Sequence, residues 1–225
     1  MKIAVIIPTL NEEQALPDTL QRTTALGFAD VLVVDGGSTD CTRAIAASHN
    51  VRCVTSRPGR ACQMNAASSH SQAEVLLFLH ADTLLPPTAR QDIDRALADP
   101  ACVGGRFDVR FERDAGLAWL IARLISLRSR WSGIATGDQA LFVRREIFER
   151  LGGFADMPIM EDVDFTRRLK HAGRTASLRT LVVTSYRRWK RCGAFRTIVL
   201  MWTLRFLYWI GVHPNRLKNL YASVR

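Results

Sequence analysis

The sequence has few cysteines, and its C-terminal part has no acidic residues. The five cysteines form an odd set without the paired spacing of a metal site or a disulfide framework, which favours reduced cysteines used as small core residues. Residues 1–164 hold 17 basic and 21 acidic side chains, whereas the residues after Asp164 include 14 Lys or Arg and no Asp or Glu. Such a basic region is typical of proteins with an anionic partner.

A long, uninterrupted apolar run is also missing. The most apolar segment, residues 193–212, is broken by Arg196 and Arg205, and a central Arg costs about 2.5–3.5 kcal/mol on membrane-insertion scales. We therefore expect a helix that packs on a surface. This surface is a membrane, the rest of the same domain or a second copy of the chain. Residues 1–8 do not resemble a secretory signal, so we expect a cytoplasmic protein with peripheral contact on the inner face of the cell membrane through residues 193–212.

The first hundred residues predict an α/β fold. Hydrophobic residues make up 48% and charged residues 23% of the sequence, which excludes a disordered chain. Short β-branched runs alternate with helical patterns, as a parallel sheet covered on both faces requires. We expect strands at residues 3–8, 31–35, 51–55 and 75–80, and helices at residues 13–26, 39–48, 62–69 and 88–98.

The pattern changes after residue 100. Residues 103–111 alternate in the manner of an antiparallel strand, and two further strands are expected at residues 140–143 and 176–184. Helices are expected at residues 116–127, 144–151 and 161–171. The last of them is expected to end at Gly173, as a C′ glycine in the left-handed conformation.

Polar segments follow the first four expected strands, at residues 8–13, 35–40, 57–65 and 80–83. Ligands of open parallel sheets bind beyond the carboxyl ends of the strands, so we expect these segments to form a site. Asp35 there has two interpretations: it accepts hydrogen bonds from a nucleobase or ribose, or it only caps a helix. Gly36 and Gly37 let the backbone approach a ligand closely.

Two further groups contain carboxylates. Asp82 is suited to share a hard divalent cation with the oxygens of a phosphorylated ligand. His80 is either a ligand, which would favour Mn²⁺ over Mg²⁺, or a residue that orients the loop. Glu161, Asp162 and Asp164 open an expected helix, where they complement the helix dipole or supply a general base toward a hydroxyl nucleophile.

These motifs occur in the order seen in family 2 glycosyltransferases. The sequence reads IIPTLNEE at residues 6–13, VDGGSTD at residues 34–40, LHADT at residues 79–83 and then Glu161-Asp162, and the resemblance covers residues 1 to about 190. It is most similar to the bacterial subgroup labelled radical-SAM/selenium-domain-associated transferases, because it reads HAD rather than DAD and has Gly137-Asp138-Gln139 before an Arg-Arg-Glu helix start.

The resemblance implies a GT-A fold and inverting, metal-dependent transfer of a sugar from a nucleotide-diphosphate sugar to a hydroxyl acceptor that is lipid-linked or membrane-associated. Asp162, with Glu161 beside it, matches the catalytic base, and Asp82 would hold Mg²⁺ or Mn²⁺, with His80 as a weak second ligand. Contacts to the nucleotide sugar are implied for Pro8, Thr9, Asn11, Glu12, Asp35, Gly37, Arg60, Asn65, Ala81 and Asp82. The resemblance also implies that Gly137, Asp138 and Gln139 shape the acceptor side of the site.

The match departs from the family pattern at two positions. Gly36 replaces the second Asp of VVDDGS, which removes one nucleobase contact, and His80 replaces the first Asp of the DxD motif, which leaves Asp82 as the main protein ligand for a metal. Trp131 lies near the Gly137 segment in the sequence, and it either floors the acceptor pocket or packs in the core.

We expect residues 1–190 to form the transferase domain, with a nucleotide-sugar half (1–100) and an acceptor half (101–190), and residues 191–225 to form a basic amphipathic helical segment. A non-catalytic nucleotide-sugar-binding protein is the main alternative. Nucleic-acid binding by the basic tail is a further alternative, but the apolar run at residues 197–204 argues against a solvated arm, so no nucleic acid is expected as a partner. A nucleotidyltransferase would need a glycine-rich loop after the first strand, where this sequence has none.

Overall fold

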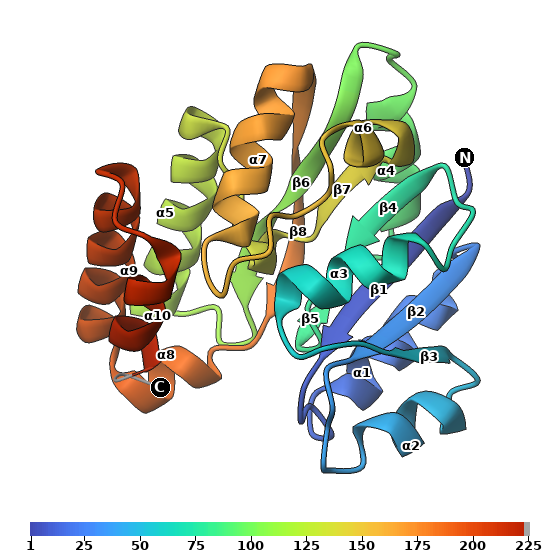
Figure 1. The fold of residues 1–225 in the computed structure, drawn as a ribbon, viewed down its shortest axis with the longest axis horizontal. Coiled ribbons are helices and arrows are strands. Elements are labelled where there is room, and N and C mark those ends of the chain that lie inside the picture. The colour runs from blue at the N-terminus through green and yellow to red at the C-terminus, as the bar shows by residue number, and fades with distance from the viewer. Residues whose placement is uncertain (223–225) are drawn as a thin grey trace.

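The computed structural model describes residues 1–222, apart from the side chains of residues 188 and 222. Its framework is one eight-stranded mixed sheet with the strand order β3-β2-β1-β4-β7-β6-β8-β5 (Figure 1). The strands are β1 (Ile3–Thr9), β2 (Asp30–Asp35), β3 (Arg52–Thr55), β4 (Val75–Phe78), β5 (Thr83–Leu84), β6 (Cys102–Phe111), β7 (Leu141–Arg144) and β8 (Arg174–Thr184).

Helices connect these strands and cover both faces of the sheet. They are α1 (Leu16–Ala25), α2 (Thr42–Ser48), α3 (Arg60–Ser68), α4 (Ala89–Leu97), α5 (Leu117–Ser132), α6 (Arg145–Arg150), α7 (Glu161–Ala172), α8 (Arg187–Cys192), α9 (Ala194–Trp209) and α10 (Pro214–Ala222), with a short 3₁₀ helix η1 (Gly137–Gln139). Every strand and helix expected from the sequence is present, although α5 extends five residues beyond its expected end at residue 127.

β1, β4 and most of β2 are buried on both faces, as predicted, whereas the edge strand β3 is only partly buried. β1 pairs in parallel with β2 and β4, and β2 pairs in parallel with β3. Along β1, Ile3, Val5 and Ile7 pack into one core with α1, α2 and α4, while Ala4 and Ile6 pack into a second core with α3, α6 and α7. The helices of the second core lie in front of the sheet in Figure 1. Successive side chains of a strand point to opposite faces, so a strand between two cores is apolar at nearly every position.

The direction of β6 differs from its prediction along most of its length. It is antiparallel to β7 only at Gly104 and Gly105, and it is parallel to β8 from Cys102 to Phe111. The two glycines allow a close approach of three strands, since a Cβ at position 104 would lie 2.5 Å from the Phe142 carbonyl oxygen. The sequence pattern of residues 103–111 reflects how the strand is buried in a mixed sheet. It does not indicate whether the neighbouring strands are parallel or antiparallel.

Two helix starts and one glycine conformation also differ from expectation. α1 begins at Leu16 and α2 at Thr42, because the residues before them form the hydrogen-bonded loops of the site. The helix α7 ends at Gly173 as expected, but the left-handed conformation is wrong: its φ of 166° is extended. Glycine is needed there for space, because a Cβ would collide with Val103 Cγ1.

The segment 193–212 forms α9, with α8 before it and α10 after it. One edge of α9 packs on the chain itself: Ala194 and Ile198 contact a cluster on α5, and Leu204 is buried against Met160. No helix within residues 1–222 is both long and apolar enough to cross a membrane. The expected surface helix is therefore partly covered by its own domain and exposes its opposite face.

We predict that Gly104→Ala destabilises the fold by about 1–3 kcal/mol, because the new methyl group overpacks the junction of β6 and β7. The smaller gain from restricting the unfolded chain, about 0.4–1 kcal/mol, does not offset this loss. Urea unfolding followed by circular dichroism measures the difference. An unchanged free energy of unfolding would show that the three strands approach less closely than described.

Candidate active site

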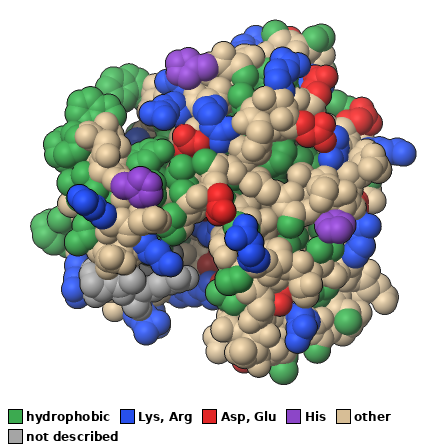
Figure 2. Space-filling view, viewed as in Figure 1, with side chains coloured by type: hydrophobic (Ala, Val, Ile, Leu, Met, Phe, Trp, Pro, Cys, Tyr) green, Lys and Arg blue, Asp and Glu red, His purple; other side chains and the backbone are tan. Residues whose placement is uncertain are grey.

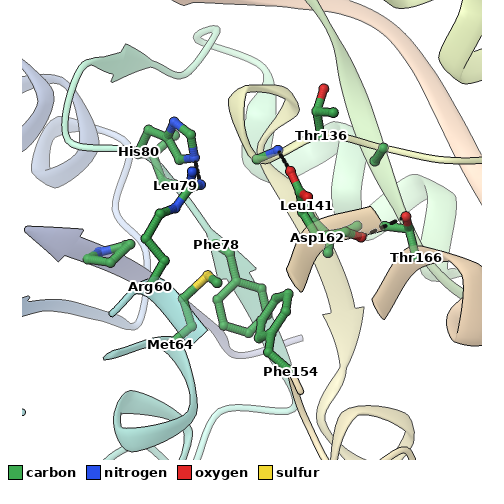
Figure 3. Close-up of a pocket in the computed structure, with 13 residues that line it drawn as sticks. Arg60, Met64, Phe78, Leu79, His80, Thr136, Leu141, Phe154, Asp162 and Thr166 are labelled. Carbon is green, nitrogen blue, oxygen red and sulfur yellow. Dashed lines mark hydrogen bonds between the residues drawn. The ribbon is translucent and has the colours of Figure 1, made fainter. Parts of the chain in front are cut away.

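The carboxyl ends of β1, β2 and β4 meet at one edge of the sheet, and residues from distant segments gather there. Because β7 is antiparallel to β4, the residues that precede β7, in η1, lie at this same edge. The N-termini of α3 and α7 complete the group. Together they line a pocket (Figure 3) formed by Pro8, Arg60, Met64, Phe78, Leu79, His80, Ala135, Thr136, Gly137, Leu141, Phe154, Asp162 and Thr166.

The loops after β1 and β2 hold each other through side-chain hydrogen bonds. The Asn11 backbone N–H donates to Ser38 Oγ (2.9 Å), and the Asn11 side-chain oxygen accepts from the Thr39 N–H (2.9 Å). The Glu12 N–H donates to Thr42 Oγ1 at 2.9 Å. Asn11 has a left-handed backbone with φ 55°, which Asn tolerates better than most residues. These contacts fix the direction of the Glu12 side chain.

Asp35 is completely buried below these loops. Its carboxylate accepts hydrogen bonds from the backbone N–H groups of Gly37 (3.1 Å) and Ser38 (3.0 Å) and from the Ser38 hydroxyl. The carboxylate thus holds its own turn, and it caps no helix, because α2 begins only at Thr42. A contact of Asp35 with a nucleobase or ribose stays a prediction.

Gln63 is a site-forming residue that the sequence analysis missed. Its side-chain amide donates to the Thr9 and Val34 carbonyl oxygens, both at 2.7 Å, and its side chain is buried. It ties α3 to the ends of β1 and β2 and so positions Arg60 one turn earlier on the helix. A polar residue at a buried position of an amphipathic helix was the available signal.

Asp82 shares an arginine with Glu12. Arg187 Nη2 lies 2.7 Å and 2.8 Å from the two Glu12 carboxylate oxygens and 3.3 Å from Asp82 Oδ2. Burial raises the pKa of the Asp82 carboxyl and the Glu12 charge adds to this, while Arg187 opposes it. Arg187 comes from α8, more than 100 residues further along the chain, and no sequence motif places it here. The two carboxylates form a small region of negative potential that already holds one cation.

Arg60 lies beside His80 on one side of the pocket (Figure 3). Its guanidinium contacts His80 Nε2 and lies 3.4 Å from the Glu161 carboxylate. Gly137 packs directly against both Arg60 and His80, where any Cβ would collide. His80 is therefore turned toward Arg60, in agreement with a loop-orienting role. The role of His80 as a weak second ligand of a metal ion stays a prediction.

Asp162 faces the pocket from the first turn of α7. Its Oδ2 accepts a hydrogen bond from the Gly137 N–H (2.7 Å), and its Oδ1 accepts from the Val163 N–H (2.7 Å). The preceding Met160 has a left-handed backbone with φ 71°, a conformation that is costly for a residue with a side chain and that gathers at functional sites. The chain turns sharply at Met160, and this turn points Glu161 and Asp162 toward the pocket.

The other predicted site residues have varied positions. Gln139 is buried and forms a capping box with Thr136. Asp138 Oδ1 is buried without a hydrogen-bond partner in the described part of the chain. Asn65 binds the Phe154 backbone with both ends of its amide, at 2.7 Å and 2.9 Å, and Thr9 and Ala81 are buried. Trp131 is 93% exposed, so it neither packs in the core nor lines the pocket.

The donor set around Asp82 fits a hard divalent cation that takes few ligands from the protein. Two carboxylates, Asp82 and Glu12, already stabilise a positive group at this position. Residues 1–222 contain no group of three or more His, Cys, Asp or Glu side chains arranged to hold a metal ion. Most ligands of such a cation would therefore come from a diphosphate and from water, as is common for Mg²⁺.

Comparison with known proteins identifies the family. The model of the glycosyl transferase family 2 domain matches residues 4–155, which is more than half of the chain. This chain belongs to glycosyl transferase family 2. An undecaprenyl-phosphate 4-deoxy-4-formamido-L-arabinose transferase from Salmonella paratyphi A is 30% identical over 162 residues, which cover 64% of this chain and 48% of that protein. The chain thus spans about half the length of the curated relatives it matches.

Two solved structures share the fold. The mannosyltransferase PcManGT from Pyrobaculum calidifontis, in complex with GDP-Man and Mn²⁺, superimposes with a TM-score of 0.62 at 24% identity, over 81% of this chain and 56% of that chain. S. aureus TarS in complex with UDP-GlcNAc gives a TM-score of 0.66 at 19% identity, over 82% and 58% of the two chains. The GT-A fold expected from the motifs is confirmed.

We predict that Glu161 makes the stability of the fold depend on pH. Burial raises the pKa of the Glu161 carboxyl above its ordinary value of 4.5, Arg60 opposes the rise and Asp162 adds to it. Between 4.5 and the raised value the folded state binds more protons than the unfolded state, so stability falls as pH rises through this window. Glu161→Gln should remove this dependence, as urea unfolding at a series of pH values will show.

Glu149→Gln is the matched control, because the Glu149 side chain is 60% exposed in its pair with Arg145. This variant should keep the wild-type dependence on pH. If Glu161→Gln and wild type have parallel stability profiles above pH 4.5, Glu161 is not buried as described.

Proposed function

We propose that this chain transfers a sugar from a nucleotide-diphosphate sugar to a hydroxyl acceptor, with inversion at the anomeric carbon and with the help of a divalent cation. The observation that carries the proposal is that Arg60 lines one pocket with Asp162 and is also close enough to Asp82 for their charges to interact, at the carboxyl edge of the sheet. Ligands of open α/β sheets bind at this edge. Membership of glycosyl transferase family 2 supports the reaction class.

The donor diphosphate is proposed to lie between Asp82 and Arg60. Arg60 and Arg187 both present guanidinium groups here, and their planar donors suit phosphate oxygens. Asp82 would hold Mg²⁺ or Mn²⁺, which when bound neutralises charge on the leaving nucleoside diphosphate. The solved relatives with GDP-Man and Mn²⁺ and with UDP-GlcNAc support a nucleotide sugar as donor.

Asp162 is proposed as the base. Its carboxylate lines the pocket opposite Arg60 and His80 (Figure 3), and its two hydrogen bonds from backbone N–H groups hold it in place. An acceptor hydroxyl gives its proton to Asp162 as its oxygen attacks the anomeric carbon and the nucleoside diphosphate leaves from the opposite face. One base suffices for such an inverting displacement, so no covalent sugar–enzyme intermediate is needed.

The acceptor and the location follow from the C-terminal region. We propose peripheral contact of residues 193–212 with the inner face of the cell membrane and a lipid-linked acceptor, which the name of the Salmonella relative supports. The domain limits proposed are 1–190 for the transferase and 191–225 for the basic helical segment, of which residues 223–225 lie outside the described part of the chain. The HAD and Gly137-Asp138-Gln139 motifs support placement in the radical-SAM/selenium-domain-associated subgroup.

Asp162→Asn should lower the turnover of sugar transfer by about 10²–10⁴-fold, because an amide cannot accept the proton. Binding of the nucleotide sugar, measured by calorimetry, should stay close to wild type. Asp164→Asn is the control on the same helix. Asp164 pairs with Arg168 at 2.7 Å, so this variant should lower thermal stability and keep turnover. Wild-type turnover in Asp162→Asn would contradict the assignment of the base.

Asp82→Asn should abolish the part of nucleoside-diphosphate binding that depends on metal. A thermal-shift series with nucleoside diphosphates, in the presence and absence of Mn²⁺, measures this as the metal-dependent rise in melting temperature. Asp40→Asn, at the exposed end of the neighbouring loop, should keep the rise. The absence of any metal-dependent shift in the wild-type protein would contradict the proposed cation.

A further inference from the structure

The helices α5 and α9 expose a broad apolar surface. Each carries a row of large apolar side chains at spacings of three and four residues, which place them on one face of a helix. The α5 row is Leu117, Leu120, Leu124, Leu127 and Trp131, and the α9 row is Phe195, Val199, Trp202, Phe206 and Trp209, all of them exposed. Figure 2 shows hydrophobic side chains gathered at the edge of the molecule where these helices lie in Figure 1. We call these ten residues the apolar face.

Two arginines on the same helices turn inward and lack carboxylate partners. Arg128 lies on α5 and Arg205 on α9, and neither has a carboxylate within ion-pair distance in the described part of the chain. Arg128 Nη2 lies 3.5 Å from Thr136 Oγ1, and the buried Arg128 Nε has no hydrogen-bond partner among residues 1–222. A buried donor without a partner and a half-buried cation without an ion pair both cost free energy, so this arrangement points to an anionic ligand.

The charge of Arg205 acts on Arg128. Burial and the charge of Arg205 together lower the pKa of Arg128 to about 10, while the carboxylates of Asp138 and Asp162 oppose the shift. Burial lowers the pKa of Arg205 as well, while the carboxylates of Asp162 and Asp138 partly compensate. This positive pair would be relieved by a ligand that brings two negative charges.

The arginine pair lies between the candidate active site and the apolar face. Thr136, the neighbour of Arg128, lines the pocket together with Gly137 and Asp162. Asp138 and Asp162 are close enough to affect the charges of both arginines. Arg128 is four residues from Leu124 on α5, and Arg205 is three residues from Trp202 on α9, so both arginines lie along the inner edges of the apolar rows. An elongated ligand with an anionic group can therefore reach the pocket with one end and cover apolar side chains with the other.

We propose that Arg128 and Arg205 bind the phosphate group of an amphiphilic acceptor whose apolar chain lies along α5 and α9 at the surface of a bilayer. This inference rests on the proposed function and names the acceptor's chemistry. Guanidinium groups donate short, charge-assisted hydrogen bonds to phosphate oxygens, and the 14 Lys and Arg after Asp164 complement an anionic lipid surface. Phosphate binding would also explain why an arginine interrupts the apolar run at position 205.

The test is binding of the full chain to lipid vesicles by flotation. Three vesicle types are used: phosphatidylcholine alone, phosphatidylcholine with phosphatidate, which has a monoester phosphate, and phosphatidylcholine with phosphatidylglycerol, which has a diester phosphate. We expect the tightest binding to the phosphatidate vesicles. Arg128→Gln and Arg205→Gln should each weaken that binding by about tenfold, the loss expected for one hydrogen bond to a charged group.

Arg123→Gln and Arg196→Gln are the matched controls. These arginines lie on the same two helices, and both side chains are exposed. Each control removes the same charge and should weaken binding to both anionic vesicle types by the same small factor, without loss of the preference for phosphatidate. Equal losses in the controls and in the Arg128 and Arg205 variants would overturn the arginine site.

A double variant, Trp202→Ser with Phe206→Ser, tests the apolar face. It should lose vesicle binding and keep binding of inorganic phosphate, measured by calorimetry. Retained vesicle binding in this variant would overturn the bilayer part of the proposal. Circular dichroism and thermal melting check that each variant folds, and Arg128→Lys and Arg205→Lys should restore part of the phosphatidate preference.

Failure of this inference is distinguishable from failure of the proposed function. The Arg128 and Arg205 variants should keep the Mn²⁺-dependent thermal shift with nucleoside diphosphates, because Asp82 is unchanged. If the wild-type chain prefers phosphatidate vesicles but shows no such shift, the docking site is supported and the donor assignment fails. If the shift is present but no vesicle type binds, the docking site is overturned and the donor assignment stands.

Discussion

Backbone direction at the centre of the sheet is the constraint on which the site depends. β1, β2 and β4 run in parallel, so their carboxyl ends deliver Glu12, Asp35 and Asp82 to a single edge. β7 enters beside β4 in the opposite direction, so the chain reaches that same edge before β7 begins. Gly137 is thereby placed against Arg60 and Asp162 without any long excursion of the chain.

Charge is distributed to match this geometry. On the donor side, Arg187 lies between the carboxylates of Glu12 and Asp82. Across the pocket, Arg128 and Arg205 are half-buried without carboxylates of their own. One side of the site therefore attracts a positive group and the other a negative group. A nucleotide-sugar diphosphate with its cation and an anionic acceptor are complementary to these two sides.

Much of the first half of the chain was predictable, because buried parallel strands are continuous apolar runs in the sequence and polar turn residues follow them. The positions of β1, β2 and β4 and of the polar segments that follow them agree with prediction. The direction of β6 was not predictable, since burial on both sides of a mixed sheet gives the same apolar pattern for either neighbour. Local spacing also says nothing about glycine at position 173, which is required by the side chain of Val103.

The residues of the site were predictable only where they are local to a motif. Glu12 and Asp82 stand in recognisable segments, but their counter-ion Arg187 lies in a basic cluster of the C-terminal part, where nothing in the sequence singles it out. For Trp131 the sequence suggested a place in the site that the structure does not support. Trp131 is close to Gly137 in the sequence, but its side chain is exposed and lies outside the pocket. Contacts between segments that are far apart in the chain can be identified only once the three-dimensional structure is known.

The place of Arg187 in the chain has a consequence for how the molecule divides. α8, which carries Arg187, is separated from α9 by Gly193 alone, so the guanidinium between the donor-side carboxylates and the α9 row of the apolar face belong to one short stretch of polypeptide. A cut at residue 186 would leave the sheet complete, yet Glu12 and Asp82 would then repel each other without a guanidinium between them. The C-terminal helices are thus inseparable from the electrostatic balance of the sheet edge.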